Sequence, residues 1–173
     1  MRLFRKRPAA DAGRRLYAAC VSQARTPALY SELATPDTVE GRFEHYSLHV
    51  ILVMDRLVRQ GEEAAEVSQG LFDAYVRALD DALREMGVGD LSVGRKMRRI
   101  GEALYGRLRN YEAAFLGEEG ADPLETILAR TVYDGVANPP LAGMAEYVRS
   151  QRAHLADLNL QDLLAGRITW AAR

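Results

Sequence analysis

The sequence predicts an all-α protein, a single compact domain of about six to seven helices. Apolar residues recur every three or four positions along most of the 173 residues, which is the period of a helix with one buried face. No stretch alternates apolar and polar residues as a half-buried strand does. We expect residues 1–10 to form a basic flexible tail and residues 11–173 to form the helical domain.

The first part of the domain is expected to contain two main helices. The first covers residues 11–24 and meets a boundary at Thr26-Pro27, because proline disfavours helical backbone in the residue before it. A short apolar segment then leads to a turn at residues 35–37. The next helix follows Gly41 and is apolar on most sides, so we expect it in the centre of the core.

Two long helices of opposite charge follow. The first covers residues 63–86, with an apolar stripe on one face and acidic residues on the other. The second begins near Ser92, continues to about residue 115 and is basic. It contains Gly101 and Gly106, each of which destabilises a helix by about 1 kcal/mol relative to alanine. We expect these glycines to mark close packing against another helix or against an occupant of a groove.

The C-terminal part is expected to contain two further helices and a short last one. Asp122 is the expected cap of the first, with Pro123 in the first turn and Glu125 three residues after the cap. This helix is expected to end at Gly135. The prolines that follow begin a helix expected over residues 138–158, and the stretch LQDLLAG predicts the short one.

Composition excludes several classes of protein. A net charge of -1 is incompatible with a globally basic nucleic-acid-binding protein, although a local basic patch is still allowed. The single cysteine, Cys20, has no partner for an internal disulfide, which fits a reducing compartment. No apolar run approaches the roughly 20 residues that span a bilayer, and no secretory signal is present. We expect the protein in the cytoplasm, with peripheral attachment to the inner membrane as a further possibility.

Residues 86–99, MGVGDLSVGRKMRR, come close to the phosphate-binding pattern G-x-x-x-x-G-K-[ST]. Arg95 stands at the lysine position, and the segment before the glycines is a predicted helix, whereas a phosphate loop follows a buried strand. We therefore interpret the stretch as a joint between two helices. Gly87 would end the first helix, and Asp90 or Ser92 would cap the second.

His45 and His49 are four residues apart, so they share a helix face and could bind one metal ion. A zinc helix of the H-E-x-x-H type would have glutamate where Tyr46 stands, and no further ligand set accompanies the pair. The alternative is that both histidines are hydrogen-bonded in the core. Nothing near Cys20 is expected to lower its thiol pKa, and no serine lies in a nucleophile motif. We predict no catalytic residue, no metal and no cofactor.

Basic residues dominate positions 95–109, where Glu102 is the single acidic residue. Their side chains either form salt bridges with the preceding acidic helix or face an anionic partner such as ribosomal RNA or lipid headgroups. Any nucleic-acid contact would involve the phosphate backbone rather than base sequence. The partner-binding hypothesis rests on four of these residues: Arg95, Lys96, Arg98 and Arg99.

Two segments carry a resemblance to a known family. They are residues 38–57, TVEGRFEHYSLHVILVMDRL, and residues 71–111, which include LREMGVGD and Tyr105-Gly106-Arg107. Both are similar to the ubiquinol–cytochrome c chaperone family, and the resemblance extends over roughly residues 36–160. This family includes mitochondrial assembly factors for respiratory complex III and shorter alphaproteobacterial relatives.

The resemblance implies a chaperone and not an enzyme. Mitochondrial members, with a small partner protein, bind newly made cytochrome b near the ribosomal exit tunnel. The implied client is therefore cytochrome b or a related membrane protein, with the ribosome or an anionic membrane surface as further partners. An apolar groove would hold the client, and we expect its lining to include four aromatic residues that could also simply be core: Phe72, Tyr75, Tyr105 and Tyr111.

Two other functions stay open at this point. One is a helical protein that binds a ligand or a metal through His45 and His49. The other is a module that docks on the ribosome or on lipid and has no dedicated client.

Overall fold

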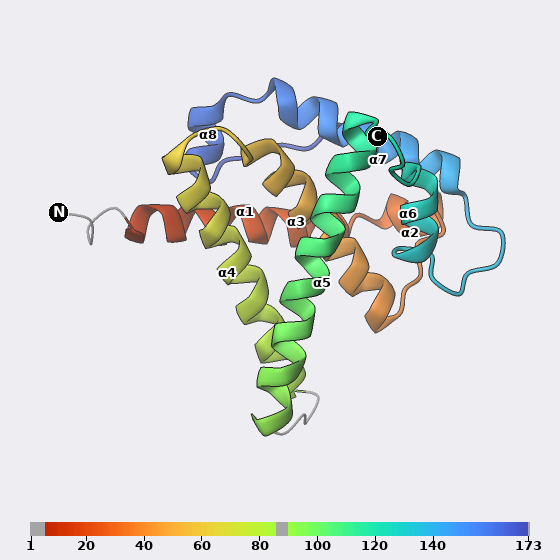
Figure 1. The fold of residues 1–173 in the computed structure, drawn as a ribbon, viewed down its shortest axis with the longest axis horizontal. Helices are drawn as coiled ribbons and strands as arrows, with labels where there is room; N and C mark the ends of the chain where they lie inside the picture. Colours follow the sequence, from red (N-terminus) through yellow and green to blue (C-terminus); the bar gives the residue numbers. More distant parts are fainter. Residues whose placement is uncertain (1–5, 86–89, 173) are drawn as a thin grey trace.

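A computed structural model describes the backbone of residues 6–85 and 90–172 and the side chains of residues 8–85 and 102–172. The regular elements in these ranges are all α-helices, which confirms the predicted fold class. They form one compact body from which a helical hairpin projects (Figure 1). The helices are α1 Lys6–Ala24, α2 Pro27–Ser31, α3 Val39–Leu57, α4 Glu62–Glu85, α5 Asp90–Leu116, α6 Leu124–Arg130, α7 Leu141–Asp157 and α8 Leu160–Leu164.

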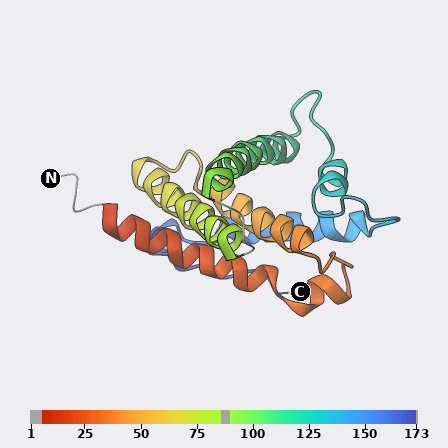
Figure 2. The same ribbon diagram turned by 90° about the horizontal axis from the view of Figure 1, so that it is seen from below.

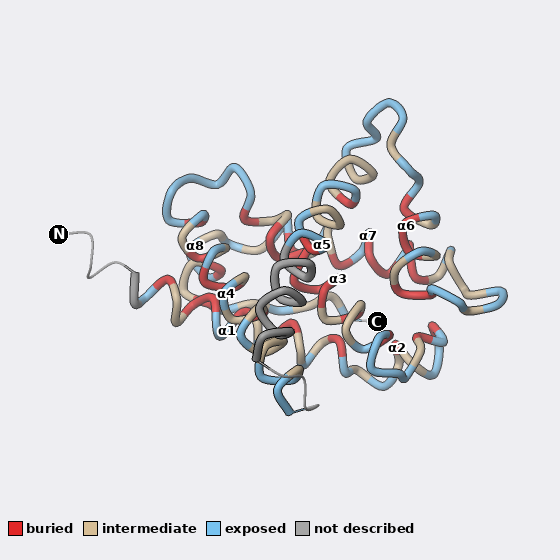
Figure 3. The backbone as a smooth tube through the Cα atoms, turned by 60° about the horizontal axis from the view of Figure 1, so that its bottom comes forward, coloured by how far each residue is buried: buried red, intermediate tan, exposed pale blue. Residues whose placement is uncertain are grey.

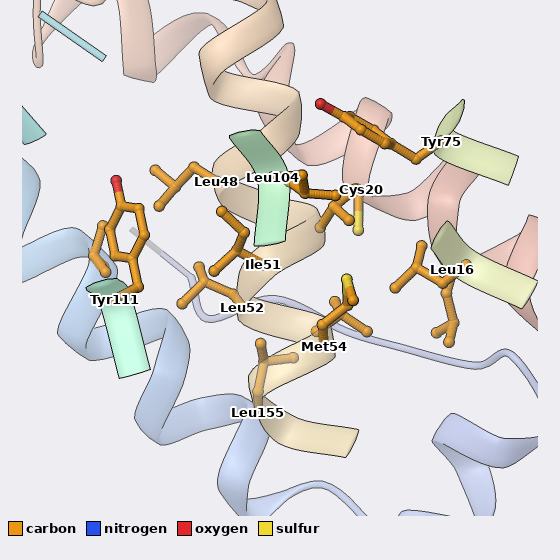
Figure 4. Packing of buried hydrophobic residues seen from close by; sticks show 14 of the residues in the cluster. Leu16, Cys20, Leu48, Ile51, Leu52, Met54, Tyr75, Leu104, Tyr111 and Leu155 are labelled. Atoms are coloured by element: carbon orange, nitrogen blue, oxygen red, sulfur yellow. The ribbon is translucent and has the colours of Figure 1, made fainter. Parts of the chain in front are cut away.

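Helix α3 forms the centre of the core, as its apolar circumference predicts. Every residue from Ser47 to Met54 is buried, and α3 packs against α1, α4, α5 and α7. Figure 3 shows these buried positions along the middle of the molecule. Figure 4 shows Leu48, Ile51 and Leu52 of α3 among side chains from the surrounding helices. A central helix with so many buried neighbours fixes the positions of the others.

Helices α1 and α4 approach each other closely where Gly13 faces Gly70. A Cβ atom added to Gly13 would lie 2.2 Å from the carbonyl carbon of Gly70, so a side chain cannot be accommodated there. The expectation that Gly106 packs closely against another helix is wrong, because a Cβ atom at that position would meet open space, and contact with an occupant of a groove stays a prediction. Gly101 lies outside the residues whose side-chain surroundings are described.

The ends of several helices differ from the sequence prediction. Helix α1 begins at Lys6 and buries Ala9, so part of the predicted tail belongs to the domain. Helix α6 has Pro123 at its N-cap, while the side chain of Asp122 forms an ion pair with Arg130 instead of capping the helix. The helix also stops at Arg130 and not at Gly135, and the chain then turns so that Val132 and Tyr133 are buried.

Helices α4 and α5 form the projecting hairpin (Figure 1). Helix α4 ends at Glu85 and α5 begins at Asp90, as expected for a joint between helices. Residues 86–89, which include the proposed C-cap Gly87, lie outside the described residues. The candidate site lies between the N-terminal half of α3 and the hairpin, where described residues of both line a groove.

Candidate functional site

A groove of about 700 Å³ runs beside the N-terminal half of α3. Its other described walls are the C-terminal part of α4, one residue of α5 and the chain that leaves α6. Figure 2 shows the N-terminal half of α3 lying between α4 and α6. We call it the α3–α4 groove. Its larger apolar side chains and its charged residues are Val39, Phe43, Leu79, Leu83, Val132, Glu40, Glu44, Arg107, Arg130 and Asp134.

The first turn of α3 is built so that it can form one wall of this groove. The hydroxyl of Thr38 accepts a hydrogen bond of 3.0 Å from the backbone N–H of Gly41 and so caps the helix. A Cβ atom at Gly41 would lie 2.2 Å from the carbonyl oxygen of Pro36, so the turn before the helix folds tightly against it. Val39 consequently faces solvent with 64% of its surface exposed. An exposed valine at the mouth of an apolar groove is a surface available for contact.

An ion pair between Glu44 and Arg107 joins α3 to α5 within the groove. The Nε of Arg107 donates to Oε2 of Glu44 at 3.0 Å, and Nη2 donates to the other carboxylate oxygen. Burial raises the pKa of Glu44, the nearby carboxylate of Asp134 raises it further, and Arg107 opposes both. Glu44 therefore depends on Arg107 to carry its charge at this site.

The charges at the rim of the groove are not balanced among the described residues. Arg107 is held by Glu44, and Arg130 is held by Asp122. Glu40 and Asp134 are exposed, and neither forms an ion pair within the described side chains. The described part of the groove is thus an apolar channel with an acidic rim.

The four predicted aromatic residues do not share one surface. Tyr75 of α4 and Tyr111 of α5 are core residues, with 1% and 2% of their surface exposed. The apolar faces of both helices pack against α3. Phe72 and Tyr105 contact each other with ring centroids 5.1 Å apart, and Tyr105 is 44% exposed. Tyr105 lines a separate hollow of about 520 Å³ beside the α3–α4 connection. The helical period of a sequence does not distinguish a core residue from one that lines a surface hollow. Client contact at Phe72 and Tyr105 stays a prediction.

The structure describes the backbone of the basic patch but not its side chains. Arg95, Lys96, Arg98 and Arg99 belong to the part of α5 in the projecting hairpin, and their side chains lie outside the described residues. Partner binding by this patch therefore stays a prediction. Arg107, the nearest described member of the basic stretch, pairs with α3 and not with the acidic face of α4.

His49 is fully engaged in a chain of buried hydrogen bonds. Its Nδ1 lies 2.7 Å from the carbonyl oxygen of His45, which can only accept, so Nδ1 carries the proton. Its Nε2 therefore accepts from the hydroxyl of Tyr147 at 2.7 Å, and that hydroxyl accepts in turn from the amide of Gln23. Both ring nitrogens are occupied by protein groups.

His45 has one satisfied and one unsatisfied ring nitrogen. The hydroxyl of Thr35 donates to the carbonyl of Leu29, so it accepts from Nε2–H of His45 at 3.0 Å. The Nδ1 of His45 is buried and forms no hydrogen bond with a described residue. In this tautomer it carries a lone pair and no proton.

Burial keeps both histidines neutral. It lowers the pKa of His49 to about 4 and, together with the neighbouring His49, that of His45 to about 3. Within the described residues no three histidine, cysteine, aspartate or glutamate side chains are grouped to hold a metal ion. Cys20 is buried as well, and burial raises the pKa of its thiol. His45, His49 and Cys20 are therefore buried side chains of the core.

Residues 6–85 and 90–172 contain no helix that combines the length and the apolarity needed to cross a membrane. This agrees with the hydropathy of the sequence.

Comparison with known proteins identifies the family. The family model described as ubiquinol-cytochrome C chaperone matches residues 31–170. The chain belongs to this family. Relatives are the ubiquinol-cytochrome c reductase complex assembly factor 1 of Xenopus laevis, 24% identical over 159 residues, and that of Homo sapiens, 25% identical over 159 residues. Each alignment covers 90% of this chain, with 78% of the frog protein and 52% of the human one. The chain thus spans about half the length of the human relative.

A solved structure has the same fold. The crystal structure of the Cbp3 homolog from Brucella abortus superposes with a TM-score of 0.83 at 29% sequence identity. The match covers 98% of this chain and 95% of that one. The fold is therefore that of the family along nearly the whole chain.

The two segments that carry the family resemblance meet in the α3–α4 groove. Residues 38–57 supply the wall from α3, and residues 71–111 supply Leu79, Leu83 and Arg107. The Glu44–Arg107 pair links one segment directly to the other. The sequence did not reveal this groove, because Phe43 and Tyr46 of α3 belong to a helix whose apolar residues are expected in the core, and helical period does not distinguish core from groove lining.

Proposed function

We propose that this protein is an assembly chaperone for ubiquinol–cytochrome c reductase, and that its client is newly made cytochrome b. Membership of the chaperone family and the names of the frog and human relatives support the assembly function. The observation that carries the proposal is the α3–α4 groove, which both family segments line and which leaves Val39 exposed. A contiguous apolar surface that stays open in a folded protein is typical of an interaction site.

The proposed mechanism is binding without chemistry. An apolar stretch of cytochrome b would cover Val39, Phe43, Leu79 and Leu83, which removes apolar surface of both proteins from water. Occupancy of the groove would shield that stretch from aggregation until haem and partner subunits replace the chaperone. No residue of the chain needs to change its covalent state for this function.

The place of action follows from the client. Cytochrome b is a membrane protein, so the chaperone would meet it at the membrane surface or as it leaves the ribosome. The basic patch Arg95, Lys96, Arg98 and Arg99 would provide the contact with anionic lipid or ribosomal RNA. Such binding would weaken steeply as salt concentration rises.

Deletion of the gene tests the assembly function. We expect the level of assembled ubiquinol–cytochrome c reductase and the haem spectrum of cytochrome b to fall, while another respiratory complex stays at its normal level. A plasmid copy of the gene should restore both. Unchanged amounts of spectrally normal cytochrome b in the deletion strain would contradict the proposal.

Site-specific crosslinking tests the groove. A photoreactive amino acid at Val39 should form a crosslink to the client in growing cells, because this side chain lies at the open mouth of the groove. The same amino acid at Ala153, which is exposed on α7 and does not line the groove, is the matched control. Equal crosslinking at the two positions would show that the groove is not the client site.

A further inference from the structure

We propose that the α3–α4 groove selects an apolar segment that carries a lysine or arginine beside its apolar residues. This inference rests on the proposed function and adds the chemistry that the groove recognises. A cation beside an apolar stretch is the usual composition at the cytoplasmic end of a membrane-spanning helix, where lysine and arginine are enriched. The occupant would thus be such an end of the client.

The apolar part of the groove provides the main contact area. Val39, Phe43, Leu79 and Leu83 come from two helices and face one hollow of about 700 Å³. This volume can take several apolar side chains in a row but is open on one side. A helical segment with one apolar face therefore fits it, with its polar face left in solvent.

The charges provide the selectivity. The described lining contains three carboxylates, on Glu40, Glu44 and Asp134, and two guanidinium groups, on Arg107 and Arg130. Both guanidinium groups are already engaged, and the partner of Arg130 lies outside the groove. A cation at this rim would find the exposed carboxylates of Glu40 and Asp134 in the groove lining, and it would not have to break an existing ion pair.

The environment of Glu44 also favours a bound cation. The carboxylate of Asp134 is close enough to raise the pKa of Glu44, so the acidic rim and the buried pair share one local field. A bound cation would reduce that repulsion. Glu40 lies in the first turn of α3, where a carboxylate is favoured by the helix dipole, and Asp134 lies in the turn after α6, where aspartate is common.

Other occupants are less compatible with this rim. Anionic lipid headgroups would be repelled by the exposed carboxylates of Glu40 and Asp134 in the groove lining. A second copy of this chain would have to place a cation from its own surface in the groove, which would make the protein self-associate. Both cases give different results in the experiment below.

The experiment uses the full chain and three helical peptides with the same apolar face. The peptides differ at one terminal position, which is lysine, glutamine or glutamate, and their affinities are compared by fluorescence anisotropy at low salt. We expect the lysine peptide to bind about tenfold more tightly than the glutamate peptide, with the glutamine peptide between them. The difference should shrink as salt is added.

Charge-neutral variants locate the selectivity. In the double variant Glu40→Gln/Asp134→Asn all three peptides should bind with equal affinity, because the shape of the groove is kept and its two free carboxylates are removed. The control Glu118→Gln/Glu119→Gln removes two exposed carboxylates from the loop after α5, outside the groove, and should keep the preference. Thermal unfolding of both variants shows that each is folded.

Several outcomes would overturn the inference. These are equal binding of the three peptides to the natural chain, a preference that persists in Glu40→Gln/Asp134→Asn, or co-sedimentation of the natural chain with anionic vesicles that Val39→Asp in the groove abolishes. Self-association that the lysine peptide does not reverse would also overturn it, because a second copy would then hold the groove.

Failure of this inference is distinguishable from failure of the proposed function. If Glu40→Gln/Asp134→Asn restores ubiquinol–cytochrome c reductase fully in the deletion strain, the charge selectivity is wrong and the assembly function stands. If deletion itself leaves the complex at its normal level, the assembly function is wrong, and the peptide affinities still report on the groove.

Discussion

Glu44 of α3 and Arg107 of α5 form an ion pair with two hydrogen bonds, and this pair connects the two segments that carry the family resemblance. The side chains are 13% and 24% exposed, so water screens the pair less than it screens an ion pair on the open surface. The pair holds α5 beside the groove and sets the position of one of its walls. The first prediction follows from its burial.

Replacement of Arg107 by alanine should lower the free energy of unfolding by about 2 kcal/mol, because it leaves Glu44 buried and unpaired near Asp134. Urea unfolding at pH 7 measures this change. The double variant Glu44→Gln/Arg107→Met removes both charges and should recover most of the loss. If Arg107→Ala is as stable as the natural chain, the pair is not structural.

The contact of α1 with α4 predicts opposite effects at two glycines. Gly13→Ala should destabilise the protein by about 3 kcal/mol, because the added methyl group meets the backbone at Gly70 and forces the helices apart. Gly106→Ala is the matched control, since its methyl group would point into open space and alanine favours a helix. It should stabilise the protein by about 0.5 to 1 kcal/mol. Thermal and urea unfolding of the two variants compare them directly, and a similar loss in both would contradict the described packing.

The buried histidines predict that stability falls in weak acid. Their pKa values are lowered to about 3 and about 4 in the fold, so below about pH 6.5 the unfolded chain binds more protons than the folded one. Each histidine should therefore lower the free energy of unfolding by about 1.2 kcal/mol for every pH unit that is removed between pH 6 and pH 4.5. Urea unfolding across this range measures the slope.

A histidine variant separates this effect from that of the carboxylates. In His49→Gln the slope between pH 6 and pH 5 should fall to about half, because one of the two titrating groups is gone. An unchanged slope in His49→Gln would contradict the buried, neutral state of this ring.

Val39 and Leu116 allow a test of the groove that leaves the fold intact. Both are exposed apolar residues, but only Val39 lines the groove. Val39→Asp should lower the level of assembled ubiquinol–cytochrome c reductase in cells several-fold without destabilising the protein, since an acidic residue is favoured in the first turn of α3. Leu116→Asp should have no effect on assembly. Equal levels in the two strains would show that Val39 is not a contact residue.

The helices could be predicted from the sequence because their apolar stripes are long, whereas the site depends on contacts between distant residues. The central place of α3 followed from its apolar circumference, and the joint after α4 followed from its glycines. The pairing of Glu44 with Arg107 joins residues 63 positions apart, and no local sequence pattern predicts it. The burial of Tyr75 could not be distinguished from groove lining either, because both environments require an apolar stripe of the same period.

The central claim is that this chain holds newly made cytochrome b before the complex is assembled. The most direct test is a short radioactive pulse, followed by isolation of the tagged chain from gently lysed cells and identification of the labelled protein that it holds. We expect labelled cytochrome b to be recovered with the natural chain, to decline during the chase as the complex forms, and to be strongly reduced with Val39→Asp. Recovery of other newly made membrane proteins in the same proportion as cytochrome b, or no recovery of cytochrome b at any time of the chase, would contradict the claim.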